Sequence, residues 1–408
     1  MPVRHTRMRV SPFTFYRGTA RIMSADLAGT PNSGFAVQVV GDGHLSNFGA
    51  YASPERRLVF DANDFDETLT GPWEWDVKRL AVSFLVAARH RGFADVDSRA
   101  ITARVVEAYR SAMAKFSEMG FMDLWYEHTG MTELRQIGSG EFDEEELNQR
   151  IDRFERKARS KNSLQALRKL TVEDEGHFRI RTDRPVLVPI RGVLPEHGPD
   201  QLEQIVRDTF TDYLTTLRPD RRLLLERYEL VDIALKVVGV GSVGTRCFIL
   251  LLEGRDSSDP LMLQAKEANA SVLEEHLHTS RYSHHGERVV EGQRQIQAQS
   301  DICLGWATGP EGRNFYVRQL RDWKRSFDVE TASPRDLDFY ARLCGQILAR
   351  GHARSGDPVA IASYMGDSPE FDDAILAFSE AYADQTVADY EAFQDAIADG
   401  TLEVSDDL

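Results

Sequence analysis

Cysteine is scarce in this sequence, which has only three among its 408 residues. Cys247, Cys303 and Cys344 form no CxxC pair, so neither a disulfide framework nor a cysteine-ligated metal site is expected. An odd count without paired spacing is typical of a reducing compartment, and we therefore expect a cytoplasmic protein.

Long apolar runs are also missing. The longest one, Cys247 to Leu252, has the length of a strand, far short of the roughly 20 residues that a membrane-spanning helix needs. Met1 to Val10 is polar and basic, which does not match a secretory signal. We therefore expect neither a membrane span nor secretion.

Basic residues are in deficit: 49 lysines and arginines stand against 65 acids, which gives a formal net charge of −16. An acidic surface repels nucleic-acid backbones and anionic membranes, so neither is expected as a partner. A local cationic cleft can still hold a nucleotide. The apolar content of 42% is ordinary for a globular protein, and 408 residues suggest two parts. The sequence does not indicate an oligomeric state.

Apolar periodicity predicts a helical start, a β-rich middle and a helical end. Helices are predicted at 13–27, 75–91, 96–127, 199–216, 221–228, 270–277, 287–299, 337–352 and 370–398, with a charged helical segment at 141–170. Strands are predicted at 35–40, 57–60, 233–240, 246–252, 261–266, 302–307 and 314–320, with a hairpin at 177–190.

Polar side chains follow two of the predicted strands, 35–40 and 57–60. They are Asp42, His44 and Asn47 after the first strand, and Asp61, Asp64 and Asp66 around the end of the second. Magnesium prefers oxygen ligands, typically one or two carboxylates together with substrate phosphates. The two strands would present Asp42, Asn47, Asp64 and Asp66 at one edge, which predicts a magnesium site. Asp and Asn also populate turns for structural reasons alone.

The segment Gly239 to Gly244 has the spacing GxGxxG, with Gly241 as its second glycine and Ser242 inside it. In a dinucleotide-binding fold the last glycine opens a helix. Here a predicted strand follows, and protein kinases cover the phosphates of ATP with such a strand–loop–strand arrangement. A glycine-rich turn without a ligand is the alternative.

A kinase-like small sheet also needs a lysine on a following strand and a glutamate on a following helix. Lys266 ends the strand 261–266, where burial would be costly without a partner charge. Glu291, in the helix 287–299, is the glutamate that we expect to pair with it, and Glu287 and Glu274 are the alternatives. Any single lysine or glutamate is usually a solvated surface charge. The prediction therefore depends on the order in which the glycine loop, the strand with the lysine and the acidic helix follow one another.

Three segments resemble those of aminoglycoside-phosphotransferase-like and choline-kinase-like enzymes. Gly41 to Asn47 resembles their catalytic loop H-G-D-x-H-x-x-N, with Val40 in place of its first histidine. Asn63 to Asp66 resembles their metal-binding segment I-D-[FW]-x-[DE]. Trp75 to Ala81 is similar to their downstream D-L-A helix, and Asp76 would be the aspartate that braces the catalytic loop.

Nearly the whole chain also resembles a mostly bacterial domain family of unknown function, DUF2252. The shared segments are Phe13 to Gly18, Gly41 to Gly49, Asn63 to Thr68 and Pro72 to Asp76. This second resemblance implies no substrate.

The resemblance to kinases implies a two-lobed, protein-kinase-like α+β fold, with a mostly helical large lobe and a small lobe around an antiparallel sheet. In such enzymes the glycine loop precedes the catalytic loop, whereas here Gly41 precedes Gly239, so we expect a circular permutation. The helix 337–352 would then lead into the catalytic loop. The expected parts are 1–230 with the catalytic loop and an acceptor-binding helical insertion at 96–230, 231–325 as the nucleotide-binding lobe, and 326–408 as the closing helices.

The same resemblance implies an ATP- and Mg²⁺-dependent phosphotransferase acting on the hydroxyl of an unknown small molecule. In it Asp42 would accept or orient the hydroxyl proton, while His44 braces the loop. The other implied roles are Asn47, Asp64 and Asp66 for the metal, Gly239, Gly241, Ser242, Gly244 and Lys266 for the phosphates, Glu291 to position Lys266, and Gln319 near the adenine. Arg17 is expected either to contact phosphate or substrate, or to form a salt bridge with one of the acids.

Three other functions stay open. A nucleotide-binding pseudokinase would regulate without turnover, and a kinase-like enzyme can also transfer AMP. A metal-dependent phosphoesterase would use Asp42, His44 and the cluster of Asp61, Asp64 and Asp66. It would leave Gly239 to Lys266 without a role.

Overall fold

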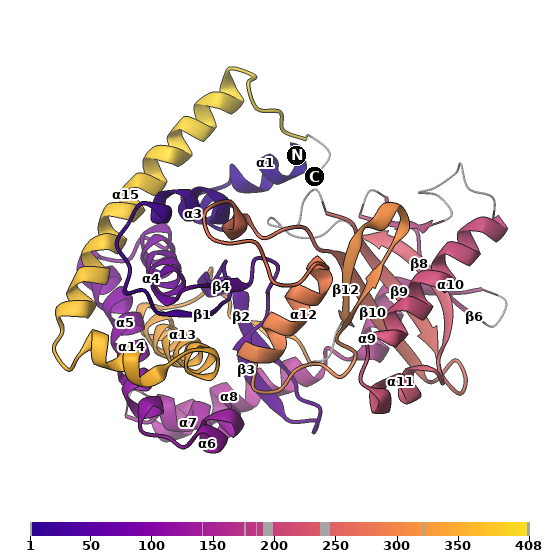
Figure 1. Cartoon of the computed structure of the whole chain (residues 1–408), viewed down its shortest axis with the longest axis horizontal. Coiled ribbons are helices and arrows are strands. Elements are labelled where there is room, and N and C mark those ends of the chain that lie inside the picture. Colours follow the sequence, from indigo (N-terminus) through magenta and orange to yellow (C-terminus); the bar gives the residue numbers. More distant parts are fainter. Residues whose placement is uncertain are drawn as a thin grey trace.

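The computed structural model describes residues 2–140, 142–174, 177–184, 186–190, 199–236, 245–320 and 323–405. Figure 1 shows a mostly helical part at one end of the molecule and a β-sheet part at the other, with α12 between them. The chain starts in the helical part, passes through the sheet part and returns. The α+β class and the antiparallel sheets that the sequence predicts are confirmed.

The helices have the following bounds. They are α1 (Pro2–Met8), α2 (Pro12–Tyr16), α3 (Ala20–Ala28), α4 (Trp73–His90), α5 (Asp95–Ser117), α6 (Phe121–Tyr126), α7 (Met131–Gly138), α8 (Glu144–Arg159), α9 (Ser163–Leu170), α10 (Pro199–Thr215), α11 (Pro219–Leu225), α12 (His285–Ile296), α13 (Pro334–Ser355), α14 (Pro358–Met365) and α15 (Glu370–Ala398). Among the described helices, none has the length and apolar character that a membrane crossing requires.

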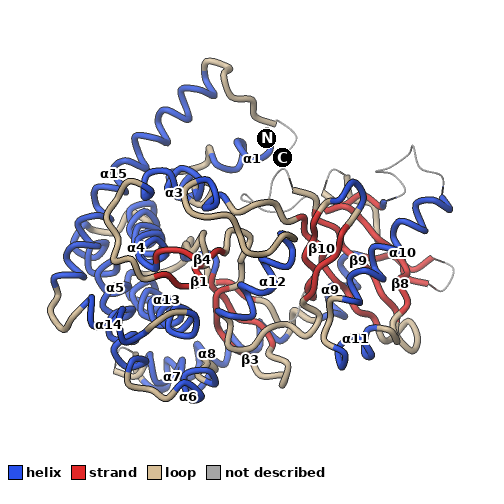
Figure 2. Tube along the Cα trace, in the orientation of Figure 1, coloured by secondary structure: helices blue, strands red, loops and turns tan. Residues whose placement is uncertain are grey.

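The strands of the described residues form four sheets, and Figure 2 shows these strands in red. They are β1 (Ala36–Val39), β2 (Phe48–Ala52), β3 (Leu58–Ala62), β4 (Leu69–Pro72), β5 (Thr171–Asp174), β6 (His177–Ile180), β7 (Leu187–Pro189), β8 (Glu229–Lys236), β9 (Cys247–Glu253), β10 (Pro260–Glu267), β11 (Gly305–Thr308), β12 (Asn314–Gln319) and β13 (Arg325–Ser326). The largest sheet has the order β11-β12-β10-β9-β8-β7, while β1 pairs with β4, β2 with β3 and β13, and β5 with β6.

The helical part is built around α4, α5 and α13. Ser333 and Asp336 form a capping box at the start of α13, and Pro334 occupies its first turn, where a missing N–H costs nothing. Gly345 lets α13 approach α5 closely, because a Cβ there would lie 2.4 Å from the carbonyl oxygen of Val105. Trp73 of α4 is fully buried. These helices fix the position of β1 and of the loop that follows it.

The six-stranded sheet is covered on both faces, as the period of two along its strands requires. On β10, Leu261 and Leu263 face α10 and α11, which contribute Tyr213 and Leu225 to the same buried cluster. The next residue along, Met262, belongs to the opposite face, which is covered by α9. Lys266 is four residues from Met262 and therefore projects from the face that α9 covers.

Several predicted boundaries are wrong. The predicted helix 13–27 is two helices, α2 and α3, and the predicted helix 96–127 divides into α5 and α6. Only a short 3₁₀ turn, Val272–Glu275, forms within 270–277, and the predicted strand 302–307 starts later, at β11. The segment 96–230 is not one unit either. Its α5 packs in the helical part, whereas α9, α10 and α11 cover the large sheet.

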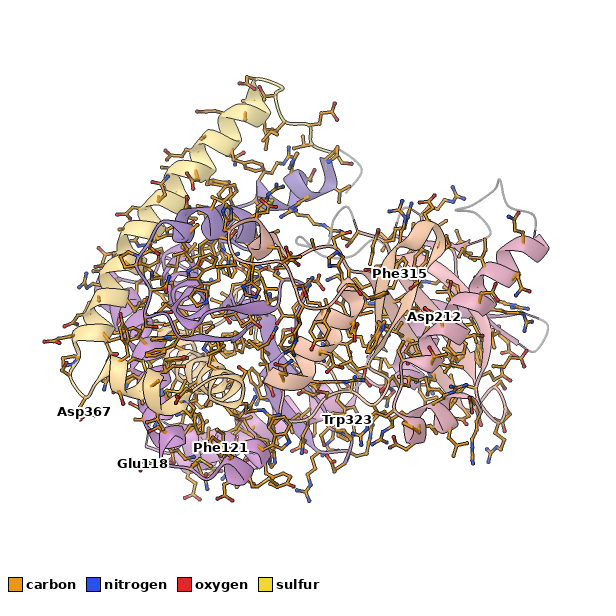
Figure 3. The ribbon with its side chains drawn as sticks, in the orientation of Figure 1. Glu118, Phe121, Asp212, Phe315, Trp323 and Asp367 are labelled. Atoms are coloured by element: carbon orange, nitrogen blue, oxygen red, sulfur yellow. The ribbon has the colours of Figure 1, made fainter. Side chains whose placement is uncertain are left out.

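The return of the chain from the sheet to the helical part is marked by Trp323, which is labelled in Figure 3. Its backbone N–H donates to the carbonyl of Lys161, in the connection between α8 and α9. The guanidinium groups of Arg159 and Arg56 lie 4.2 and 4.4 Å from its ring centre. Two cations on one indole stabilise the junction between the two parts.

Candidate functional site

The site starts at the loop Gly41–Asn47, which follows β1. Gly41 has a φ of +84°, and a Cβ at this position would lie 2.2 Å from the carbonyl oxygen of Glu67. Glycine is therefore required there for both the left-handed conformation and the close approach. The contact sets the loop 41–47 directly against the segment 63–68 that follows β3, which we call the acid loop.

Asp76 holds the start of the loop 41–47 from the first turn of α4. Its carboxylate accepts from the backbone N–H groups of Val40 (2.6 Å) and Gly41 (3.0 Å). It also accepts from Nε2 of His352, at 3.1 Å, and Nδ1 of His352 accepts from the hydroxyl of Tyr109, at 2.8 Å. The structure thus places Asp76 as the sequence analysis expects, with His352 of α13 as an additional partner.

Asp42 lies in the loop with one carboxylate oxygen fixed. Nε and Nη2 of Arg79 donate to its Oδ1 at 3.0 and 2.8 Å, and the guanidinium also stacks on the ring of Tyr16. Arg79 is three residues after Asp76, so both side chains leave the same face of α4. The Asp42 side chain remains 20% exposed, and its Oδ2 is the oxygen that stays available.

His44 lies beside Asp42 and is buried. Its Nδ1 accepts from the N–H of Ser46 at 3.2 Å, so the proton of the neutral ring is on Nε2, which is 3.8 Å from Oδ2 of Asp42. Burial lowers the pKa of His44 to about 4, although Asp42 opposes this shift. His44 is therefore neutral at physiological pH.

Asn47 connects the two loops. Its Nδ2 donates to the carbonyl of Asp42 at 2.9 Å, which leaves its Oδ1 as the remaining acceptor. Its own carbonyl accepts from the N–H of Asn63 at 2.9 Å. This backbone bond places the acid loop next to Asp42.

The acid loop meets Lys266, which lies 200 residues away in the sequence. Nζ of Lys266 donates to Oδ2 of Asp66 and lies 3.9 Å from Oδ1 of Asp64. The hydroxyl of Tyr316, on the neighbouring strand β12, donates to Oδ1 of Asp66 at 2.8 Å. The structure thus brings together the lysine and the acids that the sequence analysis places in one site.

The charges of this cluster hold one another ionised. Burial alone would lower the pKa of Lys266, but Asp64 and Asp66 outweigh it and raise this pKa well above its usual value. Burial alone would raise the pKa of Asp64, but Lys266, Arg318 and Lys324 outweigh it and lower this pKa. For Lys324, burial and the nearby Arg318 lower the pKa to about 7.

Cations outnumber acids at this position. Three of them, Lys266, Arg318 and Lys324, act on the carboxylates Asp64 and Asp66. Arg318 Nη1 also donates to the carbonyl of Asn63 at 3.0 Å. An additional anionic group would be stabilised here, and phosphate is one such group.

Glu291 is not brought to Lys266. Its Oε1 accepts from Nη1 of Arg294 at 2.6 Å on its own helix, and Asp66 already compensates the charge of Lys266. The residue of α12 that reaches the acid loop is Arg288. Its guanidinium donates to the carbonyls of Thr68 (2.6 Å) and Asp66 (2.8 Å), so α12 supports the acid loop through a cation.

The other expected site residues lie as follows. The segment from Gly239 to Gly244, with Gly241 and Ser242, falls outside the described residues. Gln319 ends β12, and its N–H donates to Oδ2 of Asp301 at 2.5 Å. Arg17 follows α2, and Asp42 is near enough to oppose the lowering of its pKa by burial.

Asp61 is turned away from the other acids. Its Oδ2 lies 2.6 Å from Nη2 of Arg350, and both side chains are buried. Among the described residues, no three His, Cys, Asp or Glu side chains gather in a way that could hold a metal ion. Of the acids expected for a two-metal phosphoesterase, Asp61 thus pairs with Arg350, while Asp64 and Asp66 lie beside Lys266.

A single magnesium ion shared with phosphates fits the residues better. Oδ1 of Asp64 is buried and has no hydrogen-bond partner in the described part of the chain. One or two carboxylates and an amide oxygen, such as that of Asn47, are the ligands that Mg²⁺ takes when substrate phosphates and water complete its shell.

Six contributors to the site were not predicted: Arg79, Arg288, Tyr316, Arg318, Lys324 and His352. The signal for Arg79 was its spacing of three residues from Asp76 on one helix face. Arg288 had no local signal, because its partners are backbone carbonyls, among them that of Thr68, 220 residues earlier, and that of Asn269.

Glu67 provides a test of burial in the acid loop. Burial, with Asp66 and Asp42 nearby, raises its pKa to about 7, although the N–H of Val272 donates to it at 2.7 Å. The folded state then binds this proton more tightly than the unfolded state, whose glutamate has a pKa near 4.5. Glu67 therefore contributes stability below pH 4.5 that is lost as the pH rises to about 7.

The variant Glu67→Gln should remove this pH dependence, because its amide oxygen can still accept from Val272. At pH 8 we expect its free energy of unfolding to exceed that of the wild type by about 1–2 kcal/mol, with little difference at pH 4.5. Denaturant titrations at both pH values measure this, with the exposed Glu55→Gln as control. Equal stability at pH 8 would contradict the assigned burial.

Comparisons with known proteins give one match. The family described as "Uncharacterized protein conserved in bacteria (DUF2252)" matches residues 1–396. Neither the comparison with curated proteins nor the comparison with solved structures gave a match.

Proposed function

This chain belongs to the DUF2252 family of bacterial proteins, and we propose that it is an ATP- and Mg²⁺-dependent phosphotransferase that acts on a hydroxyl group of a small molecule. The observation that carries the proposal is the contact of Lys266 with Asp66 and its 3.9 Å distance from Asp64. In phosphoryl transfer, catalysis depends almost entirely on positioning and on neutralising phosphate charge. A lysine, two carboxylates and a separate aspartate are the groups that such a site needs.

In this proposal Asn47 and Asp64 would hold Mg²⁺, and Asp66 would assist. Bound there, the ion would supply positive charge that stabilises the negative charge of the phosphates. Lys266 exchanges its contact with Asp66 for the phosphates, and the surplus cations Arg318 and Lys324 help to balance their charge. Asp42 orients the acceptor hydroxyl and takes its proton through Oδ2, because Arg79 already occupies Oδ1.

The same proposal includes a kinase-like arrangement whose order in the sequence is circularly permuted. Two contacts support it. Oγ of Ser355, at the end of α13, accepts from the N–H of Gln38 in β1 at 3.1 Å. Oγ1 of Thr6 donates to the carbonyl of Ser405 at 3.0 Å, so the two ends of the described chain lie together, as Figure 1 shows. The end of helix α13 thus lies beside β1. In the sequence, however, α13 comes about 300 residues after β1.

A nucleotide-binding regulator without turnover is the second candidate. The feature that favours it is α9, whose Leu167 and Leu170 cover Ile249 and Met262 on the sheet face from which Lys266 projects. A base placed beside phosphates at Lys266 would compete with α9 for this apolar face. A regulator only needs to bind the nucleotide, so a restricted site is sufficient for it. An enzyme must also exchange substrate and product at each turnover.

The proposal is tested by thermal unfolding with ATP, ADP and GTP, each with and without Mg²⁺. A ligand at 100 times its Kd adds about 2.7 kcal/mol to the stability of the folded state, so we expect a clear rise in Tm with at least one nucleotide. Asp64→Ala should lose the part of the rise that depends on Mg²⁺. The exposed Asp97→Ala is the matched control and should keep it. Absence of any shift in the wild type would refute nucleotide binding.

A further inference from the structure

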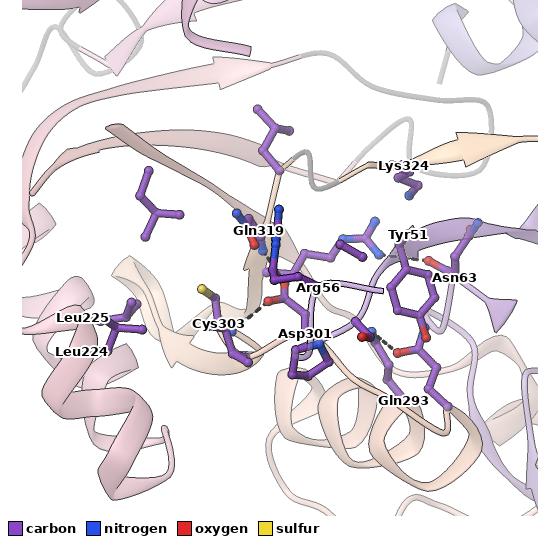
Figure 4. A pocket seen from close by; sticks show the side chains of 18 of the residues that line it. Tyr51, Arg56, Asn63, Leu224, Leu225, Gln293, Asp301, Cys303, Gln319 and Lys324 are labelled. Atoms are coloured by element: carbon purple, nitrogen blue, oxygen red, sulfur yellow. Dashed lines mark hydrogen bonds between the residues drawn. The ribbon is translucent and has the colours of Figure 1, made fainter. Parts of the chain in front are cut away.

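A cavity of about 230 Å³ lies between the large sheet, α11, α12 and the β2–β3 hairpin (Figure 4). It adjoins the acid loop through Asn63 and does not contain Asp64 or Asp66. Arg318, Gln319 and Lys324 line it and have roles in the expected nucleotide site, but these roles do not account for its apolar wall. Its volume exceeds the roughly 150 Å³ that accommodates a benzene ring in a protein interior, so a single-ring molecule with a small substituent fits.

One wall of the cavity is apolar and the other is polar. The apolar wall consists of Leu224, Leu225, Leu261, Ile302 and Leu320. Asn63, Gln293, Arg318 and Lys324 line the polar side. Asp301 lies there too, and its carboxylate oxygens accept from the N–H groups of Cys303 and Gln319. Figure 4 shows Leu224 and Leu225 across the cavity from Asn63 and Lys324. A ligand that fills it needs an apolar body and polar groups on one side.

Gln293 presents an unused acceptor to the cavity. It is only 5% exposed, and its Nε2 donates to Oε1 of Gln297 at 2.9 Å. Nε2 of Gln297 in turn donates to the carbonyl of Ala62 at 2.6 Å, which fixes the orientation of both amides. Oε1 of Gln293 has no partner among the described residues. A buried acceptor of this kind is normally satisfied, so it indicates a donor from a ligand or from water.

Two donors lie near by. Nδ2 of Asn63 has no hydrogen-bond partner in the described ranges, and the ammonium group of Lys324 interacts with Asp64 and Asp66 through its charge. Both line the cavity. An ammonium group and an amide N–H₂ together fit a carboxylate, which accepts several hydrogen bonds.

We propose that this cavity is a second small-molecule site, which binds a single-ring carboxylate that carries an N–H or O–H donor. The carboxylate is bound by Lys324 and Asn63, the donor meets Oε1 of Gln293, and the ring packs against Leu224, Leu225 and Leu261. The site shares Lys324 with the proposed nucleotide site, but Asp42, Asp64 and Lys266 do not line it.

Isothermal titration of the full chain with 4-aminobenzoate tests this proposal. Benzoate lacks the donor and 4-aminobenzamide lacks the charge, so each should bind about tenfold more weakly. Lys324→Gln should weaken 4-aminobenzoate about tenfold and leave 4-aminobenzamide unchanged. Asp64 opposes the lowering of the pKa of Lys324 by burial, so the control uses the neutral ligand. Asp64→Ala should leave the affinity for 4-aminobenzamide unchanged, which separates this test from the test of nucleotide binding.

A cavity-filling pair of variants completes the experiment. Leu224 lines the cavity and is 38% exposed, so Leu224→Trp can enter the cavity from its rim and should abolish binding. Its neighbour Leu223 is 60% exposed and does not line the cavity, so Leu223→Trp should bind as the wild type does. No binding of 4-aminobenzoate to the wild type, or equal binding in both tryptophan variants, would show that only water fills the cavity.

Discussion

Replacing Asp76 with alanine is expected to lower the free energy of unfolding by about 3–5 kcal/mol. The carboxylate is 1% exposed and accepts hydrogen bonds from Val40, Gly41 and His352. Alanine would leave three donors without an acceptor, those of Val40 and His352 buried and that of Gly41 partly buried, and each unsatisfied buried donor costs about 1–3 kcal/mol. Denaturant titration followed by circular dichroism measures the loss.

A matched pair of variants separates the lost hydrogen bonds from the lost volume. Asp76→Asn keeps the shape of the side chain and one acceptor oxygen, so it should lose less stability than Asp76→Ala. Asp97→Ala removes an exposed carboxylate and should change stability by less than about 0.5 kcal/mol. Equal stability of Asp76→Ala and Asp97→Ala would show that the hydrogen bonds of Asp76 do not stabilise the loop 41–47.

Much of the sheet could be predicted because its strands alternate regularly. The predicted strands 246–252, 261–266 and 314–320 correspond closely to β9, β10 and β12. In contrast, β2 and β4 were not predicted. β4 has the sequence Leu-Thr-Gly-Pro and becomes a strand only because β1 lies beside it, with Val39 paired to Leu69. Pairing of this kind depends on tertiary context rather than on local propensity.

The break between α2 and α3 shows a second limit. The apolar pattern of 13–27 continues across Arg17–Thr19, but the hydroxyl of Thr19 donates to the carbonyl of Tyr16, and the chain turns there. Gly18 lies against Met8, and a Cβ at Gly18 would be 2.7 Å from its sulfur. No local sequence pattern predicts how α1 packs, and this packing brings Met8 of α1 close to Gly18.

The parts of the site that lie close together in the sequence could be predicted. The parts that depend on contacts between distant segments could not. The residues of the loop 41–47 and of the acid loop were expected as neighbours, and the bond between Asn63 and Asn47 joins these loops. The expectation for Glu291 assumed that a glutamate must balance Lys266. In the structure the acid loop supplies that charge itself, and Arg288 binds the backbone of the same loop.

Under the proposed function, Asp42→Asn should slow the transfer of the phosphoryl group from ATP by about 10²–10⁴-fold. Asparagine keeps the size of the side chain and an oxygen that Arg79 can contact, but it cannot take the proton of the acceptor hydroxyl. Binding of ATP with Mg²⁺ should persist, because Asn47, Asp64 and Lys266 are unchanged. Formation of ADP with water as acceptor measures the rate, and the exposed Asp97→Asn should match the wild type.

This comparison also decides between the enzyme and the regulator. A regulator would bind ATP with Mg²⁺ and give the same background rate of ADP formation in the wild type and in Asp42→Asn. An enzyme would lose its rate and keep its nucleotide-dependent rise in Tm, because Asp42 acts on the acceptor while Asp64 and Lys266 act on the phosphates. The two residues are held by different elements, Asp42 by Arg79 of α4 and Lys266 by β10, so one function can fail without the other.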